Sequence, residues 1–168
     1  MRASDPEGPA TPGAPDQTST RQVVVNVMDR GAPDFADPEV EESRPVLMFV
    51  ADAPAGDPLL EATLEQEGYR VVTLQPGADA LETFRRYRPQ GLIFEVAAPE
   101  GGALGVCHML KTHPLGWDVP ALVVSTGLDP AILQAAGAAG AHELMSRPFA
   151  PDVLVDTIRR LVGSPTSP

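Results

Sequence analysis

The chain has 168 residues, with 23 acidic and 12 basic side chains and a formal net charge of −11. This acidic balance argues against a surface for nucleic acid or an anionic membrane, because binding to phosphates needs clustered positive charge. The single cysteine, Cys107, excludes an internal disulfide and a thiolate zinc cage. No apolar run approaches the ~18–20 residues of a membrane span, and the start of the sequence has no apolar signal segment. We therefore expect a soluble, cytoplasmic protein.

Residues 1–44 differ in composition from the rest of the chain. They hold six prolines, nine acidic and four basic residues, for a net charge of −5. Such a segment buries too little apolar surface to offset its chain entropy, so we predict a disordered, acidic, proline-rich arm. Its apolar stretch at 23–28, VVVNVM, forms either one short strand, on this sheet or on a partner, or a sticky patch in the tail. Residues 164–168, SPTSP, are predicted to be a C-terminal tail.

Residues 45–163 alternate short apolar runs with helical patterns and are predicted to form one domain. The predicted strands are 46–50, 71–74, 91–96, 121–125 and 142–145. The predicted helices are 59–68, 80–88, 104–113, 130–140 and 153–163. Asp57-Pro58 and Asp129-Pro130 each place an N-cap acid before a proline at the first helical position, and Gly68 stands where a helix commonly ends.

The runs at 46–50, 92–96 and 121–125 are apolar almost throughout, which is typical of strands covered on both faces. Five strands alternating with five helices predict a doubly wound α/β fold with a parallel sheet and right-handed crossovers. A functional crevice is expected at the carboxyl ends of its strands. The polar residues at these predicted ends are Asp52, Glu95, Ser125 and Arg147.

On these residues the stretch from Pro45 to Gly163 resembles a receiver domain of two-component response regulators (CheY-like). The resemblance rests on four motifs: VAD after the first strand, FEVAAP at the third, Ser125 after the fourth, and Arg147-Pro148-Phe149 after the fifth. The segments EGYRVVTLQPGADALETFRRYRPQGLIFE and AAGAHELMSRPF are also similar to the family. The resemblance implies a flavodoxin-like five-stranded parallel sheet in the order 2-1-3-4-5.

The resemblance also implies a phosphorylation site, from which this sequence departs. In the family an aspartate accepts a phosphoryl group beside a bound Mg²⁺, and Glu95 stands at that position. Ala51 replaces one of the two metal-binding acids, Arg147 replaces the lysine, and Leu144 replaces the switch aromatic. Asp52 and Ser125 match the family pattern, so Mg²⁺ at Asp52 and Glu95 is expected to be weak at most. We therefore interpret the domain as a degenerate, atypical pseudo-receiver.

Three functions stay open from the sequence. The leading one is a stand-alone receiver that is not phosphorylated in the usual way. Its Glu95 either reaches toward Arg147 and Ser125 and imitates part of the phosphorylated arrangement, or is a relic that forms an ordinary carboxylate–guanidinium pair with no signalling consequence. In both cases the domain is not an enzyme and acts by contact with a protein, through a face within residues 130–162. The second function is a phosphorelay receiver that accepts phosphate by an atypical route. The third is a small-ligand sensor that uses the crevice near Asp52 and Glu95.

Two further features of the sequence, the single cysteine and a basic cluster, are interpreted as structural. Cys107 is predicted to be a core thiol. The basic cluster of Arg85, Arg86 and Arg88 is interpreted as a solvated helix end that complements the helix dipole. No DNA-binding segment follows residue 163, so we expect the effect of the chain to be exerted through another molecule.

Overall fold

The computed structural model describes residues 44–54 and 56–165. The predicted arm, apart from Arg44, lies outside the described residues, and so does its apolar stretch at 23–28. The same is true of residues 166–168 of the predicted tail.

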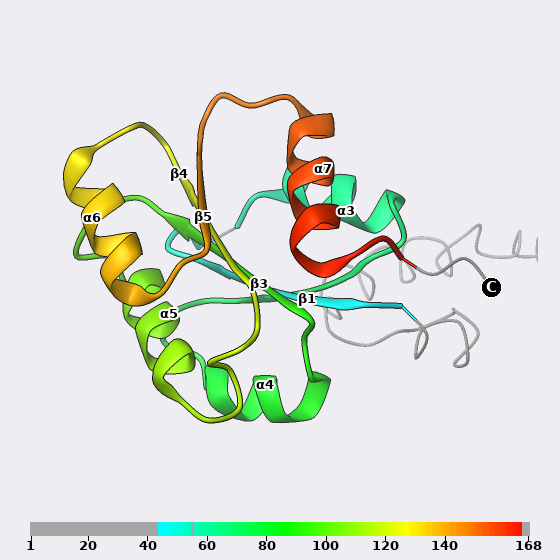
Figure 1. Ribbon diagram of the computed structural model, residues 1–168, viewed down its shortest axis with the longest axis horizontal. Coiled ribbons are helices and arrows are strands. Elements are labelled where there is room, and N and C mark those ends of the chain that lie inside the picture. The colour runs from blue at the N-terminus through cyan, green and yellow to red at the C-terminus, as the bar shows by residue number, and fades with distance from the viewer. Residues whose placement is uncertain (1–43, 55, 166–168) are drawn as a thin grey trace, which may run out of the picture. The chain divides into compact units, whose positions relative to one another are not determined.

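Five strands and five helices alternate along the described chain (Figure 1). The strands are β1 (Val46–Ala51), β2 (Arg70–Leu74), β3 (Gly91–Val96), β4 (Ala121–Ser125) and β5 (Glu143–Ser146). The helices are α3 (Pro58–Gln66), α4 (Ala80–Tyr87), α5 (Gly102–Thr112), α6 (Pro130–Ala139) and α7 (Pro151–Val162). All strand pairs are parallel, in the order β2-β1-β3-β4-β5, which confirms the predicted fold class.

The predicted element boundaries differ from the structure by one or two residues. The fifth strand was predicted at 142–145 and lies one residue later, at Glu143–Ser146. Helices α5 and α7 begin two residues before their predicted starts, at Gly102 and Pro151. Proline suits the first turn of a helix because it needs no hydrogen-bond acceptor there, and this explains the earlier start of α7.

Side chains fix several of the helix ends, as the sequence predicts. Asp57 Oδ1 accepts hydrogen bonds from the amides of Leu59 and Leu60, at 3.0 and 3.2 Å, and so caps α3. Asp129 Oδ1 caps α6 by accepting from the Ala131 amide at 2.8 Å. After α3 the chain turns at Gly68, whose φ of +98° lies in the left-handed region that glycine adopts without strain.

The sheet separates two apolar layers. Helices α4, α5 and α6 cover one face, and α3 and α7 cover the other (Figure 1). The largest buried side chains of the first layer include Phe94 and Leu110, and those of the second include Phe49 and Tyr69. Because β1, β3 and β4 are buried along almost their whole length, their polar side chains lie at or near their ends.

Lys111 ties down the loop that joins α5 to β4. Its ammonium donates to the carbonyls of Gly116, Trp117 and Val119, at 3.2, 2.7 and 2.6 Å. Three acceptors satisfy all three ammonium protons. The loop is thereby held against the end of α5, while the Trp117 side chain stays 66% exposed.

Cys107 is fully buried in the layer formed by α4, α5 and α6, as predicted for a core thiol. Its sulfur contacts the Ala139 carbonyl at 3.7 Å. Burial raises the pKa of the thiol from an ordinary 9.0 to about 11, against a smaller lowering by Lys111. The thiol therefore stays protonated over a pH range in which an exposed cysteine ionises.

This burial predicts a stability loss at alkaline pH. Between pH 9.0 and about 11 the unfolded chain loses the Cys107 proton and the folded chain keeps it, so the free energy of unfolding falls as pH rises. Cys107→Ala should remove a decline of roughly 2–3 kcal/mol across that window. Urea unfolding of both chains from pH 8 to 11 measures it. An identical decline in both chains would contradict the assignment.

Candidate functional site

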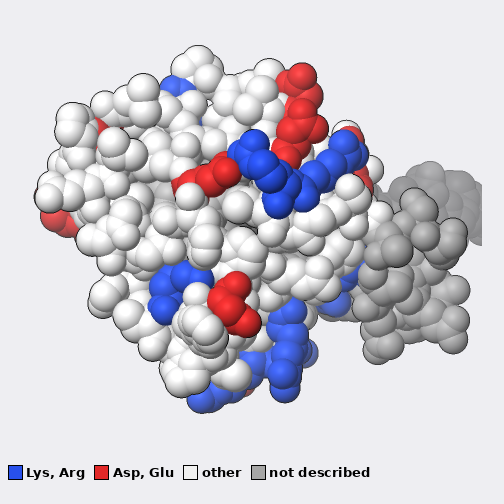
Figure 2. Space-filling model, viewed as in Figure 1, with Lys and Arg blue, Asp and Glu red and all other residues white. Residues whose placement is uncertain are grey.

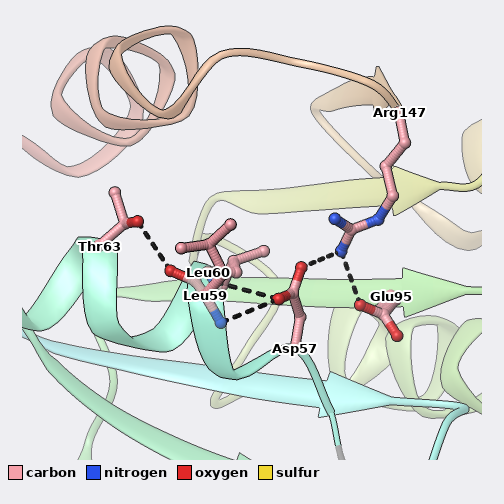
Figure 3. A network of polar contacts seen from close by, with 6 residues as sticks. All are labelled: Asp57, Leu59, Leu60, Thr63, Glu95 and Arg147. Carbon is pink, nitrogen blue, oxygen red and sulfur yellow. Dashed lines mark hydrogen bonds and ion pairs between the residues drawn. The ribbon is translucent and has the colours of Figure 1, made fainter.

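Arg147 joins the ends of three elements at the carboxyl edge of the sheet (Figure 3). Arg147 directly follows β5. Its Nη2 donates to Oε2 of Glu95, a residue near the end of β3, at 2.8 Å. The same nitrogen forms an ion pair with Asp57 Oδ2, at the start of α3. The side chains are 31% exposed for Arg147, 17% for Asp57 and 13% for Glu95. One guanidinium therefore neutralises two half-buried carboxylates.

Asp57 is a site residue that the sequence argument missed. Its Oδ1 caps α3, and its Oδ2 is free to meet Arg147, so one carboxylate performs both tasks. The N-cap motif Asp57-Pro58 was recognised, and a helix that follows β1 starts at the carboxyl edge of the sheet. Because Arg147 lies at the same edge, the N-cap position of Asp57 is the feature of the sequence that indicates their proximity.

Asp52 lies at the same edge and has different partners. Its Oδ1 accepts from the Ala103 amide at 2.8 Å, and its Oδ2 accepts from the Ala97 amide at 3.1 Å. The first of these bonds satisfies an amide in the first turn of α5, where the N-cap residue, Gly101, has no side chain. Asp52 thus serves as the cap that α5 takes from another part of the chain.

Ser125 and Leu144 are positioned by the core. Ser125 is fully buried, and its hydroxyl donates to the Gly127 carbonyl at 2.7 Å, within its own turn. A hydroxyl has one proton to donate, so in this rotamer Ser125 offers none to Glu95. Leu144 is half-buried against the layer formed by α4, α5 and α6. The structure brings all four predicted strand-end residues together, because the Asp52 amide donates to the Glu95 carbonyl at 3.1 Å and the Arg147 amide donates to the Ser125 carbonyl at 2.9 Å. Among their side chains, those of Glu95 and Arg147 are hydrogen-bonded to each other.

The site offers a poor set of ligands for Mg²⁺. Ala51 supplies no oxygen from its side chain, both carboxylate oxygens of Asp52 accept backbone amides, and Glu95 Oε2 is paired with Arg147. Within residues 44–54 and 56–165 there is no group of three or more His, Cys, Asp or Glu side chains that could hold a metal ion. The carboxylate oxygens at the positions that hold Mg²⁺ in the family thus already accept hydrogen bonds from protein donors.

Phe149 supports the guanidinium from a second direction. The Cζ atom of Arg147 lies 5.3 Å from the centroid of the Phe149 ring, and Phe149 packs on the layer formed by α3 and α7. Cation–π contact of this kind adds to the ion pairs and restricts the arginine side chain. The arrangement holds a positive charge in a fixed place between two negative ones.

Comparison with known proteins assigns the family. Residues 47–159 match the model of the response regulator receiver domain. The chain therefore belongs to the response regulator receiver domain family, a family of two-component signalling. In the described part of the chain, no helix is long and apolar enough to cross a membrane.

Curated relatives agree with this assignment. The chain is 35% identical over 117 residues to the response regulator MprA of Mycobacterium leprae, covering 69% of this chain and 50% of that protein. It is 33% identical over 117 residues to MprA of Mycobacterium ulcerans, covering 69% of this chain and 49% of the relative. The chain spans about half the length of the curated relatives it matches.

Solved structures show the same fold. A response regulator signal receiver domain from Bermanella marisrubri is 29% identical, with a TM-score of 0.61, covering 71% of this chain and 98% of that one. The chemotaxis response regulator CheY4 of Vibrio cholerae has a TM-score of 0.60 at 24% identity, covering 70% and 98%. At this identity the second likeness concerns the fold alone.

The close approach of Asp52 to Gly101 predicts which glycine near α5 can be replaced. A Cβ at Gly101 would overlap Asp52 Oδ2 and lie 3.0 Å from the Ala98 carbonyl oxygen, so Gly101→Ala must displace the carboxylate from its two amides. We expect a loss of about 1–3 kcal/mol in the free energy of unfolding, measured by urea titration.

Gly105→Ala is the matched control for this change. A Cβ there meets nothing within 4 Å and lies inside α5, so the substitution should raise stability by about 0.5–1 kcal/mol. Equal effects of Gly101→Ala and Gly105→Ala would show that the carboxylate does not fill the space at Gly101.

The two ion pairs of Arg147 predict an unequal response to the loss of an arginine. Arg147→Met strands two half-buried carboxylates and should lower the free energy of unfolding by roughly 1–3 kcal/mol. Arg159→Met removes an exposed pair with Glu67 and should lose less than about 1 kcal/mol. Adding Glu95→Gln to Arg147→Met should restore part of the loss. Strict additivity of the two changes would contradict the coupling.

Proposed function

We propose that this receiver domain is a degenerate pseudo-receiver, held in one state and not phosphorylated by the usual aspartate mechanism. The observation that carries the proposal is the contact of Arg147 with both Glu95 and Asp57. In the family the basic residue at this position pairs with the phosphorylated acid. Here the corresponding guanidinium is already paired with two carboxylates of its own chain.

The chemistry of Glu95 supports the same proposal. Phosphoryl transfer depends on positioning and charge neutralisation, and one added methylene displaces the carboxylate by roughly an ångström. A displacement on that scale can lower a rate by about 10²-fold. Glu95 Oε2 also makes the 2.8 Å bond to Arg147, and moving that oxygen toward a phosphoryl donor would break the bond.

The two positions that transmit a phosphorylation signal in the family, Ser125 and Leu144, also support the proposal. Ser125 binds Gly127, and Leu144 has no ring whose burial could report a change at the site. A domain of this kind acts as a fixed docking surface and not as an enzyme. We propose that it works without a bound metal, in the cytoplasm, through a protein partner on the face within residues 130–162, which includes α6 and α7.

Exposed apolar side chains on that face support a protein partner. Leu133 on α6 is 57% exposed, and Val153 on α7 is 49% exposed. Leu128, in the loop before α6, is 77% exposed. Apolar side chains at such exposure gain from burial against another protein.

Incubation with acetyl phosphate and Mg²⁺ tests the proposal. We expect no gain of a phosphoryl group by intact mass, and no change in the amide NMR spectrum, in the wild-type chain. The Glu95→Asp variant tests whether the extra methylene alone blocks transfer. Because Arg147 and Ala51 are retained, we expect at most a trace of phosphorylation in it. A family member with an aspartate at this position is the positive control.

A phosphoprotein formed by the wild-type chain and abolished in Glu95→Ala would overturn the proposal. It would favour the atypical phosphorelay receiver instead. Phosphorylation that persists in Glu95→Ala would place the acceptor elsewhere, and the domain would then not be fixed in one state.

A further inference from the structure

A groove lies at the edge of the sheet opposite to the Arg147 site. It is bounded by the end of α4 and by the loop between α5 and β4, and it encloses about 180 Å³. Its lining residues are Phe84, Arg85, Arg88, Pro89, Leu115 and Val119. The floor is apolar, since Phe84 and Pro89 are buried, and Arg85 and Arg88 are exposed. Such a groove fits a segment that carries both apolar and acidic side chains.

The arginines of this groove differ from several other basic residues of the domain, which have partners within it. Arg147, Arg159 and Arg160 each form ion pairs, and Lys111 binds three carbonyls. Within the described residues, Arg85 and Arg88 have no ion-pair partner. Figure 2 shows basic side chains gathered at the lower edge of the view, where Figure 1 places α4. This is an unneutralised positive site on an otherwise acidic chain.

Arg88 is also held in an unfavourable backbone conformation. Its φ of +49° lies in the left-handed region, and it is the one residue other than glycine found there in the described part of the chain. Glycine would end α4 with less strain. Strain that the structure retains at one residue points to a use for its side chain, and here that side chain lines the groove.

The start of β1 lies beside a residue that neighbours this groove. The Gln90 amide donates to the Val46 carbonyl at 2.8 Å, so the first residue of β1 lies next to the residue that follows Pro89. Residues 36–43, ADPEVEES, precede this point and contain four acidic residues and no basic one. Glu42 is four residues from Val46 and can reach about 13 Å, and Asp37 can reach about 30 Å.

We propose that the acidic segment 37–42, Asp-Pro-Glu-Val-Glu-Glu, binds in the groove of its own chain in solution. Its carboxylates would pair with Arg85 and Arg88, and Val40 would cover part of the apolar floor. The short connection gives an effective concentration on the order of millimolar, so weak exposed ion pairs suffice to populate the bound state. The bound segment would shield this edge of the domain from other acidic ligands.

The chain offers a direct probe of this binding. Trp117 is the single tryptophan, so its indole N–H gives one NMR signal, and it lies in the loop that borders the groove. Cys107 is fully buried and its pKa is raised to about 11, so a cysteine introduced by Val40→Cys can be spin-labelled selectively in the folded full-length chain.

We expect the oxidised label to broaden the Trp117 indole signal strongly at low salt, and its reduction to restore the signal. Because the contact is electrostatic and exposed, high salt should also restore the signal. Arg85→Gln should restore at least half of the lost intensity. Arg86→Gln is the matched control, because it removes the same charge from the same helix. Arg86 does not line the groove, and its Cζ lies 5.4 Å from the centroid of the Tyr87 ring. This variant should leave the broadening in place.

A charge exchange distinguishes pairing from general attraction. Glu39→Arg with Glu41→Arg should abolish the broadening, and adding Arg85→Glu with Arg88→Glu should bring it back. The proposal is overturned if the wild-type chain shows no broadening, or if Arg85→Gln and Arg86→Gln act alike. Broadening that disappears on dilution would show that a second copy supplies the segment, and would also overturn it.

Discussion

The ion pairs of Arg147 with Glu95 and Asp57 are the contact on which the carboxyl edge of the sheet depends. They join the end of β5 to β3 and to the start of α3, three segments that the sheet itself does not link directly. A central parallel sheet buried on both faces leaves charged side chains only its ends. At those ends each charge must find a partner, because a half-buried carboxylate without one is unfavourable.

The same requirement separates the roles of the two predicted acids. Glu95 is one methylene longer than aspartate and reaches the guanidinium of Arg147, whereas Asp52 turns toward the first amides of α5. Each of the two acids therefore accepts hydrogen bonds from a donor of the chain itself. These contacts join the ends of the strands to the neighbouring helices and loops.

Sequence periodicity was sufficient for the fold because it depends on buried apolar runs and on helix caps such as Asp129. It placed β3 and β4 at their observed bounds and identified Glu95, Arg147 and Ser125 as strand-end residues. It could not find the second bond of Asp57 or the amide partners of Asp52. Those contacts depend on the path of loops between elements, for which the sequence has no periodic signal.

The pairing of charged side chains differs between the two edges of the sheet. At the carboxyl edge two carboxylates share one guanidinium, and the charges are met within the domain. At the amino edge Arg85 and Arg88 find no carboxylate among the described residues, and one of them is held at a strained φ. The chain is acidic on average, yet these two arginines have no acidic partner within the described domain. The proposed binding of the acidic segment 37–42 at this edge would place carboxylates beside Arg85 and Arg88.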